Sequence, residues 1–399
     1  MLKRELYLKR VRPYYDSELI KVITGVRRCG KSVLLQQIRN ELLENGIDED
    51  RIIYINFEDY QYRELKDPDK FYNYVEDRLG GGKKHYLIFD EIQNVDKFEL
   101  VINSFRAVHD VSIFITGSNS KLLSGELSSH LSGRTISFRM MPFTFKEFCD
   151  LKEAENPESL LPEYISYGGF PIVCIAETPE MKEEILSNLY DSIVLKDIIM
   201  RNKVASPAAL ERVLEYLTAN SSLTLSGQSI ARTLSDQTQS VTAPTIYDYI
   251  RYIENSCIMN KVERYDIRGK KVLAFEEKSY ICDLGFFHIK KNRIKDEFGR
   301  IIETLIYNEL IARGYQVYIG KTFKGEVDFI AQKGHKKVYI QAAYHLEDEE
   351  TIEREFGAYK SIHDNYPKYV ISHDDWKLDD ADGIIHLPLL EFLLDENSI

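Results

Sequence analysis

The sequence predicts an α/β protein in which a parallel sheet comes first, a helical section follows and a small second α/β domain ends the chain. Three observations lead to this prediction. Apolar, strand-like runs alternate with longer amphipathic stretches over the first 150 residues, which is the pattern of a parallel sheet with crossover helices. The pattern is then largely helical to about residue 255, and α/β alternation returns after about residue 280.

The first section contains five apolar runs that we expect to be strands, at residues 19–25, 51–56, 86–90, 111–116 and 135–140. Helices are expected between them, at residues 31–43, 68–79 and 98–108. Because 399 residues are too many for one ordinary core, we expect four parts. They are a sheet domain at residues 1–144, a helical linker or lid at 145–205, a winged-helix domain at 206–278 and a terminal domain at 279–399.

Composition argues against several classes of protein. The chain is 44% hydrophobic and 29% charged, with no apolar run that could span a bilayer and no secretory signal near its start. Its five cysteines lie far apart without CxxC spacing, which argues against a zinc site or a disulfide framework and suits a cytoplasmic location. The net charge of −12 disfavours a surface that binds nucleic acid as a whole, although a local basic patch could still do so.

One glycine-rich loop carries the strongest chemical signal. The stretch Gly25-Val-Arg-Arg-Cys-Gly-Lys-Ser32 matches GxxxxGK[ST] in full, between a predicted strand and a predicted helix. Glycines let backbone amides curl around phosphates, Lys31 can reach the β and γ phosphates, and the Ser32 hydroxyl can bind Mg²⁺. We therefore predict a P-loop that binds ATP with Mg²⁺. The residues expected to contact the nucleotide are Gly25, Val26, Arg27, Arg28, Cys29, Gly30, Lys31, Ser32 and Val33.

A second signal is the apolar strand that ends in Asp90 and Glu91. Such a strand delivers a carboxylate to its carboxyl end beside the P-loop, where Asp90 can hold the Mg²⁺ shell. Glu91 can then polarise the attacking water as a general base. An acidic turn after a buried strand would look the same, but the complete P-loop upstream favours the metal site.

Two further positions could act on the γ-phosphate. A third strand ends in Ser118-Asn119, where a polar side chain could orient the water; Asn119 is the first candidate and Ser118 the second, with a simple turn as the alternative. Arg134 is a candidate arginine finger, or else a surface residue in an ion pair. Arg27 and Arg28 are rival sources of positive charge.

These motifs resemble, nearly end to end, a widespread group of prokaryotic AAA-plus-like ATPases in which an AAA domain precedes a C-terminal domain of unknown function. The resemblance implies an ATPase, a winged helix and a terminal fold similar to restriction endonucleases. It rests on Lys21-Val-Ile-Thr-Gly-Val-Arg-Arg-Cys-Gly-Lys-Ser32, Asn56-Phe-Glu58, Asp90-Glu-Ile-Gln93, Thr116-Gly-Ser-Asn119, Ser132-Gly-Arg134, Pro142-Phe-Thr-Phe-Lys-Glu-Phe148, Gly168-Gly-Phe-Pro171, Tyr280-Ile-Cys-Asp-Leu-Gly285, Arg313-Gly-Tyr-Gln-Val-Tyr-Ile-Gly-Lys321, Glu326-Val-Asp-Phe329 and Tyr339-Ile-Gln341.

The winged-helix expectation comes from three helix-like stretches followed by a two-stranded hairpin at residues 257–275. The hairpin is basic, and it could contact DNA phosphates while the helix at residues 245–251 contacts bases. The same module could instead pack on the nucleotide domain as a regulatory lid. Its basic residues are Lys261, Arg264, Arg268, Lys270 and Lys271, against Glu263 and Asp266.

The terminal section carries part of a nuclease motif. The resemblance to restriction endonucleases places acids at Glu303 and Asp328, but Gln341-Ala342-Ala343 stands where (D/E)xK belongs. The second acid and the lysine are missing there, so we expect a structural or partner-binding remnant and no cleavage of nucleic acid. Lys337, which shares strand parity with Gln341, is a conceivable replacement for the lysine.

Together these signals predict a cytoplasmic, Mg²⁺-dependent ATPase whose hydrolysis drives a conformational switch of the later domains. Two alternatives remain at this point: an ATP-regulated DNA-binding protein and a nucleotide-dependent nuclease. Besides ATP, the expected partners are DNA through the winged helix, an unidentified protein and further copies of the chain, with no membrane.

Overall fold

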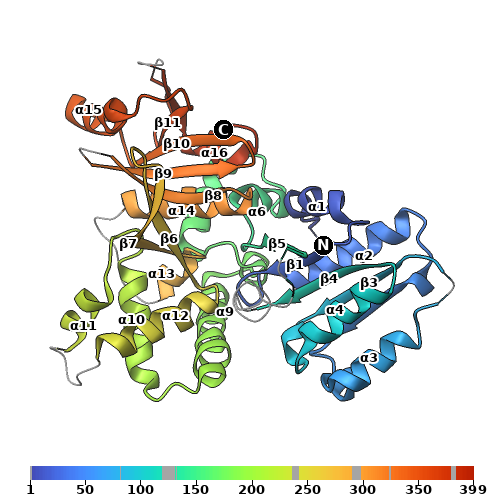
Figure 1. Ribbon diagram of the computed structural model, residues 1–399. Helices are drawn as coiled ribbons and strands as arrows, with labels where there is room; N and C mark the ends of the chain where they lie inside the picture. Colours follow the sequence, from blue (N-terminus) through green and yellow to red (C-terminus); the bar gives the residue numbers. More distant parts are fainter. Residues whose placement is uncertain are drawn as a thin grey trace. The chain divides into compact units, whose positions relative to one another are not determined.

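The computed structural model describes residues 2–80, 82–118, 131, 133–235, 242–289, 298–322, 325–378 and 383–399 (Figure 1). The chain folds into two compact units, residues 1–140 with 255–257 and residues 141–254 with 258–399. Within the described ranges, no helix combines the length and the apolar character needed to cross a bilayer.

The first unit is built on a parallel five-stranded sheet with the order β2-β3-β4-β1-β5. The five strands expected from the sequence are confirmed to within one residue at each end; β1, β3 and β4 are buried along their whole length, whereas β5, at the edge of the sheet, buries only Phe138. They are β1 (Ile20–Thr24), β2 (Ile52–Asn56), β3 (His85–Asp90), β4 (Val111–Gly117) and β5 (Thr135–Arg139).

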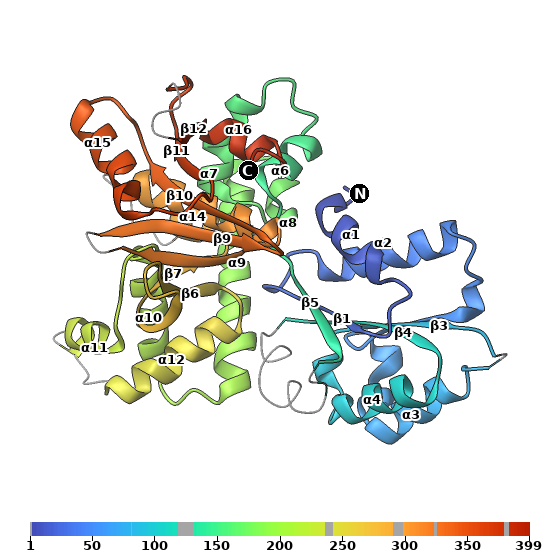
Figure 2. The same cartoon turned by 45° about the horizontal axis from the view of Figure 1, so that its top comes forward.

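Helices cover both faces of this sheet. Figure 2 shows α3 (Pro68–Glu76) and α4 (Phe98–Val108) on one face, with α1 (Glu5–Val11) and α2 (Lys31–Glu44) on the other. On the α3 face, Phe71 makes edge contacts with the rings of Phe57, Phe89 and Phe105. Short 3₁₀ turns complete the unit: η1 (Arg12–Tyr14), η2 (Glu49–Arg51), η3 (Tyr60–Lys66) and η4 (Ile92–Asn94).

The second unit begins with helices, as the sequence predicts. A Thr144–Glu147 capping box starts the first of them, and the π-helical stretch η7 continues directly from α9. The helical elements are α6 (Phe145–Leu151), η6 (Pro157–Leu160), α7 (Leu161–Tyr167), α8 (Pro171–Cys174), α9 (Pro179–Ser192), η7 (Ile193–Met200), α10 (Pro207–Ala219), α11 (Gly227–Ser235) and α12 (Ala243–Asn255).

A mixed seven-stranded sheet completes the second unit, in the order β12-β11-β10-β9-β8-β6-β7. Its strands are β6 (Met259–Asp266), β7 (Lys271–Ile281), β8 (Gln316–Lys321), β9 (Glu326–Lys333), β10 (Lys336–Ala343), β11 (Lys368–Ser372) and β12 (Ile384–Pro388). The helices beside it are α13 (Gly285–Ile289), α14 (Phe298–Ala312), α15 (Glu349–Gly357), η8 (Ala358–Ser361) and α16 (Leu389–Leu394).

The hairpin expected as the wing is part of this sheet. Strand β6 pairs in parallel with β8, with Arg264 opposite Ile319, and Figure 1 shows the yellow hairpin continuous with the orange strands. Side chains along β6 alternate between buried and exposed, and those buried at alternate positions are Asn260, Val262 and Arg264. The domain limit expected after residue 278 falls inside β7. Because the hairpin strands belong to the larger sheet and β7 runs past residue 278, the structure does not establish a separate winged helix in residues 206–278, and it stays a prediction.

Candidate functional site

The strand order of the first unit brings three predicted motifs to one edge of the sheet. Strand β4 lies between β1 and β3, with Thr116 opposite Ile23 on one side and Ile115 opposite Phe89 on the other. Because all three strands run parallel, their carboxyl ends meet. The P-loop after β1, the Asp90–Glu91 pair after β3 and the Ser118 turn after β4 are therefore neighbours.

Two positions in the P-loop require glycine. A Cβ at Gly25 would lie 2.2 Å from the carbonyl oxygen of Met140, and Gly30 has φ +107°, which L side chains rarely adopt. Gly30 also precedes the first turn of α2, which no described side chain caps. The backbone N–H groups at this helix end are therefore available to an anion, as phosphate binding requires.

Lys31 is buried inside the loop. Its Nζ donates hydrogen bonds to the carbonyl oxygens of Gly25 (3.1 Å) and Val26 (3.2 Å) and lies 3.9 Å from Glu91 Oε1. The loop is also held from outside by Arg4, a buried residue whose Nη1 donates to the carbonyl oxygen of Cys29 at 2.9 Å. No local pattern points to Arg4, because its partner lies 25 residues away.

Asp90 is fully buried, and its two oxygens differ. Oδ1 accepts a hydrogen bond from Thr116 Oγ1 at 2.5 Å, whereas Oδ2 accepts none from any described residue. Burial raises the pKa of Asp90, and the nearby hydroxyl groups of Ser32 and Thr116 oppose that rise. A buried carboxylate oxygen without a partner is unfavourable, and a cation would satisfy it. The residues thus fit a magnesium ion held by Ser32 and Asp90.

Glu91 is held in one orientation by its neighbours. Its backbone adopts the left-handed region (φ +53°), its N–H donates to Thr116 Oγ1 at 3.0 Å, and its Oε2 accepts a hydrogen bond from Gln93 Nε2. Thr116 thus touches both Asp90 and Glu91. Thr116 and Gln93 were not among the predicted site residues, although a threonine in the otherwise apolar end of β4 was a visible signal.

Of the two residues predicted to orient the water at the γ-phosphate, the structure describes only one. Ser118 is fully buried and its Oγ has no hydrogen-bond partner among the described residues, which is the state expected of a group that awaits a ligand. Asn119 lies outside the described residues, so its role stays a prediction.

Arg134 lies at the opposite edge of the sheet from its own P-loop. Its carbonyl oxygen accepts a hydrogen bond from the N–H of Ile20, at the start of β1, and its exposed Nη1 donates to Asn103 Oδ1 at 2.8 Å. The P-loop follows Thr24, four residues further along β1, or about 13 Å at roughly 3.3 Å per residue. Of the rival arginines, Arg27 lies 3.5 Å from Glu58 and Arg28 is exposed.

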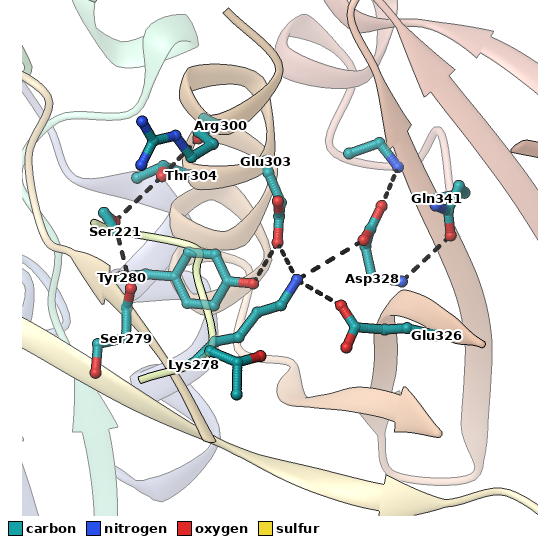
Figure 3. Close-up of polar contacts among 12 residues, drawn as sticks. Ser221, Lys278, Ser279, Tyr280, Arg300, Glu303, Thr304, Glu326, Asp328 and Gln341 are labelled. Carbon is teal, nitrogen blue, oxygen red and sulfur yellow. Dashed lines mark hydrogen bonds and ion pairs between the residues drawn. The ribbon is translucent and has the colours of Figure 1, made fainter. Parts of the chain in front are cut away.

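The second unit contains a separate acidic centre, which we define as Glu303, Glu326 and Asp328 (Figure 3). The two acids named from the sequence, Glu303 and Asp328, do lie close together. The lysine beside them is Lys278, from β7, whose Nζ lies 3.0 Å from Glu303, 2.6 Å from Glu326 and 3.9 Å from Asp328.

Lys337 is not the replacement lysine. Its Nζ lies 3.8 Å from Asp364 and contacts the rings of Tyr339 and Tyr366. It shares a face of β10 with Gln341 but lies four residues away along the strand, or about 13 Å at roughly 3.3 Å per residue. Lys278 was not among the predicted site residues, because the second hairpin strand was expected to end at residue 275, whereas β7 continues to Ile281.

The basic hairpin offers less free charge than its sequence indicates. Arg264 is buried and pairs with Glu326 at 2.8 Å, and Lys261 pairs with Glu277 at 2.8 Å. Pairing of β6 with β8 buries Arg264 in the sheet of the second unit. Three exposed basic residues remain: Arg268, Lys270 and Lys271.

Comparison with known proteins agrees with this geometry. Residues 17–149 match an AAA domain, and residues 158–296 match a domain of unknown function (DUF8612). An uncharacterised protein from Haemophilus influenzae is 37% identical over 399 residues, covering 99% of both chains. The uncharacterised protein MJ1544 from Methanocaldococcus jannaschii is 33% identical over 366 residues, covering 86% of this chain and 79% of that protein.

Among solved structures, the Walker-type ATPase PABY2304 of Pyrococcus abyssi shares the fold, with a TM-score of 0.51 and 14% identity over 74% of this chain and 96% of that one. Its likeness concerns the fold alone. The chain belongs, over its whole length, to the same family as the Haemophilus influenzae protein, and its first unit is an AAA domain with the fold of the P-loop ATPases.

Proposed function

We propose that this protein binds ATP together with Mg²⁺ at the P-loop and hydrolyses it. The observation that supports this most directly is the unpaired Oδ2 of Asp90, buried beside a phosphate loop. Burying a carboxylate oxygen without a donor is costly, and a metal-binding role explains why it is there. When bound, Mg²⁺ neutralises charge on the β and γ phosphates.

The roles of the protein groups follow from their contacts. Lys31 exchanges its two carbonyl acceptors for phosphate oxygens, and the amides of the loop and of the first turn of α2 hold the same phosphates. Glu91 takes the proton of the water that attacks the γ-phosphorus, and the bond to the β–γ bridging oxygen breaks to give ADP and phosphate. Thr116 and Gln93 hold Glu91 in place.

The second part of the proposal is that nucleotide state is transmitted to the second unit. The chain leaves the first unit at Met140, whose N–H donates to Thr24 at 2.7 Å and whose carbonyl oxygen packs against Gly25. A rearrangement of the P-loop around phosphates therefore acts directly on the segment that enters the second unit. This supports a switch driven by the γ-phosphate.

The third part concerns Arg134. Because it lies at the far edge of its own sheet, we propose that it completes the P-loop site of a neighbouring copy in a homo-oligomer. An exposed guanidinium that reaches the next subunit would supply transition-state charge there.

The test is Mg²⁺-dependent phosphate release from ATP by the wild type and by Asp90→Asn, with exposed Asp77→Asn as the matched control. We expect Asp90→Asn to bind ATP in EDTA like the wild type, to lose the tightening by Mg²⁺ and to lose turnover. Asp77→Asn should behave as the wild type. Unchanged Mg²⁺ dependence in Asp90→Asn would remove the basis of the proposal.

A further inference from the structure

The acidic centre of the second unit is enclosed by donors from its own chain. Lys278 lies between all three carboxylates, and its side chain is buried, with 8% exposure (Figure 3). It comes from β7, whereas the acids come from α14 and β9. These three elements belong to one compact unit, so the contacts are part of its core packing.

The inward-facing oxygens have protein partners. Glu303 Oε1 accepts hydrogen bonds from Lys278 Nζ at 3.0 Å and from Tyr280 OH at 2.6 Å. Asp328 Oδ2 accepts the N–H of Ala342 at 2.9 Å, while its Oδ1 faces Lys278.

Glu326 is neutralised on both sides. Its Oε1 lies 2.6 Å from Lys278 Nζ, and its Oε2 lies 2.8 Å from Arg264 Nη2. Two cationic side chains therefore face the three carboxylates. Burial lowers the pKa of Lys278, but the charges of Glu303, Asp328 and Glu326 outweigh this and raise it, so the amine is protonated at neutral pH.

Gln341 completes the closure. Its Oε1 accepts the N–H of Asp328 at 3.3 Å, and its Nε2 donates to Glu355 Oε2 at 2.8 Å. The amide is thus held in a pattern that a carboxylate could not make, because it donates as well as accepts. Gln341, which stands where the nuclease motif has its second acid, therefore links the backbone of Asp328 to the side chain of Glu355.

This arrangement does not fit a catalytic metal. Mg²⁺ requires about six oxygen ligands in near-octahedral geometry, and Ca²⁺ about six to eight. The carboxylate oxygens that face inward are already engaged, and within the described ranges no three acidic, histidine or cysteine side chains are arranged to hold a metal ion. The divalent ion implied by the resemblance to restriction endonucleases has no place beside Lys278.

We infer that the Lys278 ammonium stands where a divalent cation would otherwise bind, as a covalently attached counter-ion that closes the acidic centre. The wild-type centre therefore takes up no divalent ion. Removal of the ammonium leaves three carboxylates without their shared counter-ion. They are not arranged as a metal-ligand group in this structure, so we expect them to move together around Mn²⁺ or Mg²⁺ once the ammonium is gone. Loss of one lysine converts a closed centre into a metal site.

The test measures Mn²⁺ binding by electron paramagnetic resonance in nucleotide-free, full-length protein. Every variant carries Asp90→Asn, so that the P-loop contributes no signal. Lys278→Met keeps the length of the side chain without its charge. Lys337→Met, in β10 of the same sheet but beside Asp364, is the matched control. Lys278→Met combined with Asp328→Asn tests whether the acids are the ligands.

We expect no Mn²⁺ binding at 1:1 stoichiometry in the parent or in Lys337→Met, 1:1 binding in Lys278→Met, and loss of that binding in the double variant. Mn²⁺ should also raise the unfolding temperature of Lys278→Met alone, because a ligand that binds only the folded state stabilises it. Folding of each variant is checked by circular dichroism.

Two results would overturn the inference. One is Mn²⁺ binding by the parent that disappears in Asp328→Asn, a measurement that needs no Lys278 variant and so stands even if Lys278→Met does not fold. The other is a folded Lys278→Met protein that binds Mn²⁺ no better than Lys337→Met.

Discussion

The two units each bury a group of carboxylates, and the two groups are in opposite states. At the edge of the first sheet, Asp90 keeps one buried oxygen without a partner, next to a loop built for phosphates. In the second unit, Lys278, Arg264 and Tyr280 occupy the oxygens of the acidic centre. The difference teaches that buried acids alone do not indicate a metal site. What matters is whether the chain already supplies the cation.

We call the P-loop site with Asp90 and Glu91 the open site, and the acidic centre around Lys278 the closed centre. The largest effect is expected from Glu91, the proposed general base of the open site. Glu91→Gln should keep ATP and Mg²⁺ bound but lower turnover by about 10²–10⁴-fold, because an amide cannot accept the proton of water. Steady-state phosphate release and ATP binding are measured on the same preparation. Exposed Glu44→Gln is the control. Hydrolysis by Glu91→Gln near the wild-type rate would show that another group is the base.

Lys31→Ala should weaken ATP binding by about 100-fold or more. Two charge-assisted hydrogen bonds to phosphate oxygens are lost, each worth about 1.5–3 kcal/mol. Calorimetric titration of ATP into this variant and into exposed Lys66→Ala makes the comparison. Wild-type affinity in Lys31→Ala would contradict the assignment of the open site to ATP.

Substitution of Thr116 tests whether catalysis depends on the hydroxyl that holds Asp90 and Glu91 in place. Thr116→Val removes the hydroxyl that joins Asp90 to the Glu91 backbone, at nearly constant volume. We expect turnover to fall by about ten- to thirtyfold, as for the loss of one or two hydrogen bonds, with little change in KM. Thr116→Ser, which keeps the hydroxyl, should restore most of the activity. A role in packing alone predicts the reverse: valine, which keeps the volume, retains turnover, whereas serine, which lacks the methyl group, loses it.

Arg134 tests whether the open site is also incomplete within one chain. Arg134→Ala and Lys31→Ala chains, each inactive alone, should recover part of the wild-type activity when mixed, because an interface then pairs an intact P-loop with an intact arginine. Recovery of at most about a quarter is expected if copies pair at random. Mixed oligomers are verified by differential tagging, and verified mixtures that stay inactive would exclude action between copies.

The closed centre should give no catalytic effect. Purified protein with Mg²⁺ or Mn²⁺, with and without ATP, should leave plasmid, linear and single-stranded DNA uncut, because Lys278 and Arg264 already neutralise the carboxylates that a metal would need. A contaminating nuclease is recognised because Asp328→Ala does not affect it. Cutting that persists in Lys31→Ala and vanishes in Asp328→Ala would make the nuclease alternative the better account.

The sequence predicted the open site much better than the closed one. The P-loop and Asp90 follow from local patterns, since each sits at the end of an apolar strand and its environment is set within a few residues. Lys278 meets Asp328 through strand pairings that span 50 residues, which no local pattern encodes. The position of Arg134 was hidden for the same reason, because it depends on the pairing of β5 with the start of β1.

The docking of the first residues against the P-loop has a practical consequence for anyone who purifies this protein. The backbone N–H of Arg4 donates to Gln37 Oε1, Gln37 Nε2 donates to the carbonyl oxygen of Leu2, and Arg4 Nη1 reaches Cys29. An affinity tag fused ahead of residue 2 would begin beside the phosphate loop. Fragments trimmed to the AAA domain match at residue 17 would lose Arg4 altogether. Nucleotide-binding measurements are therefore best made on protein that keeps residues 2–16 and carries no added residues ahead of them.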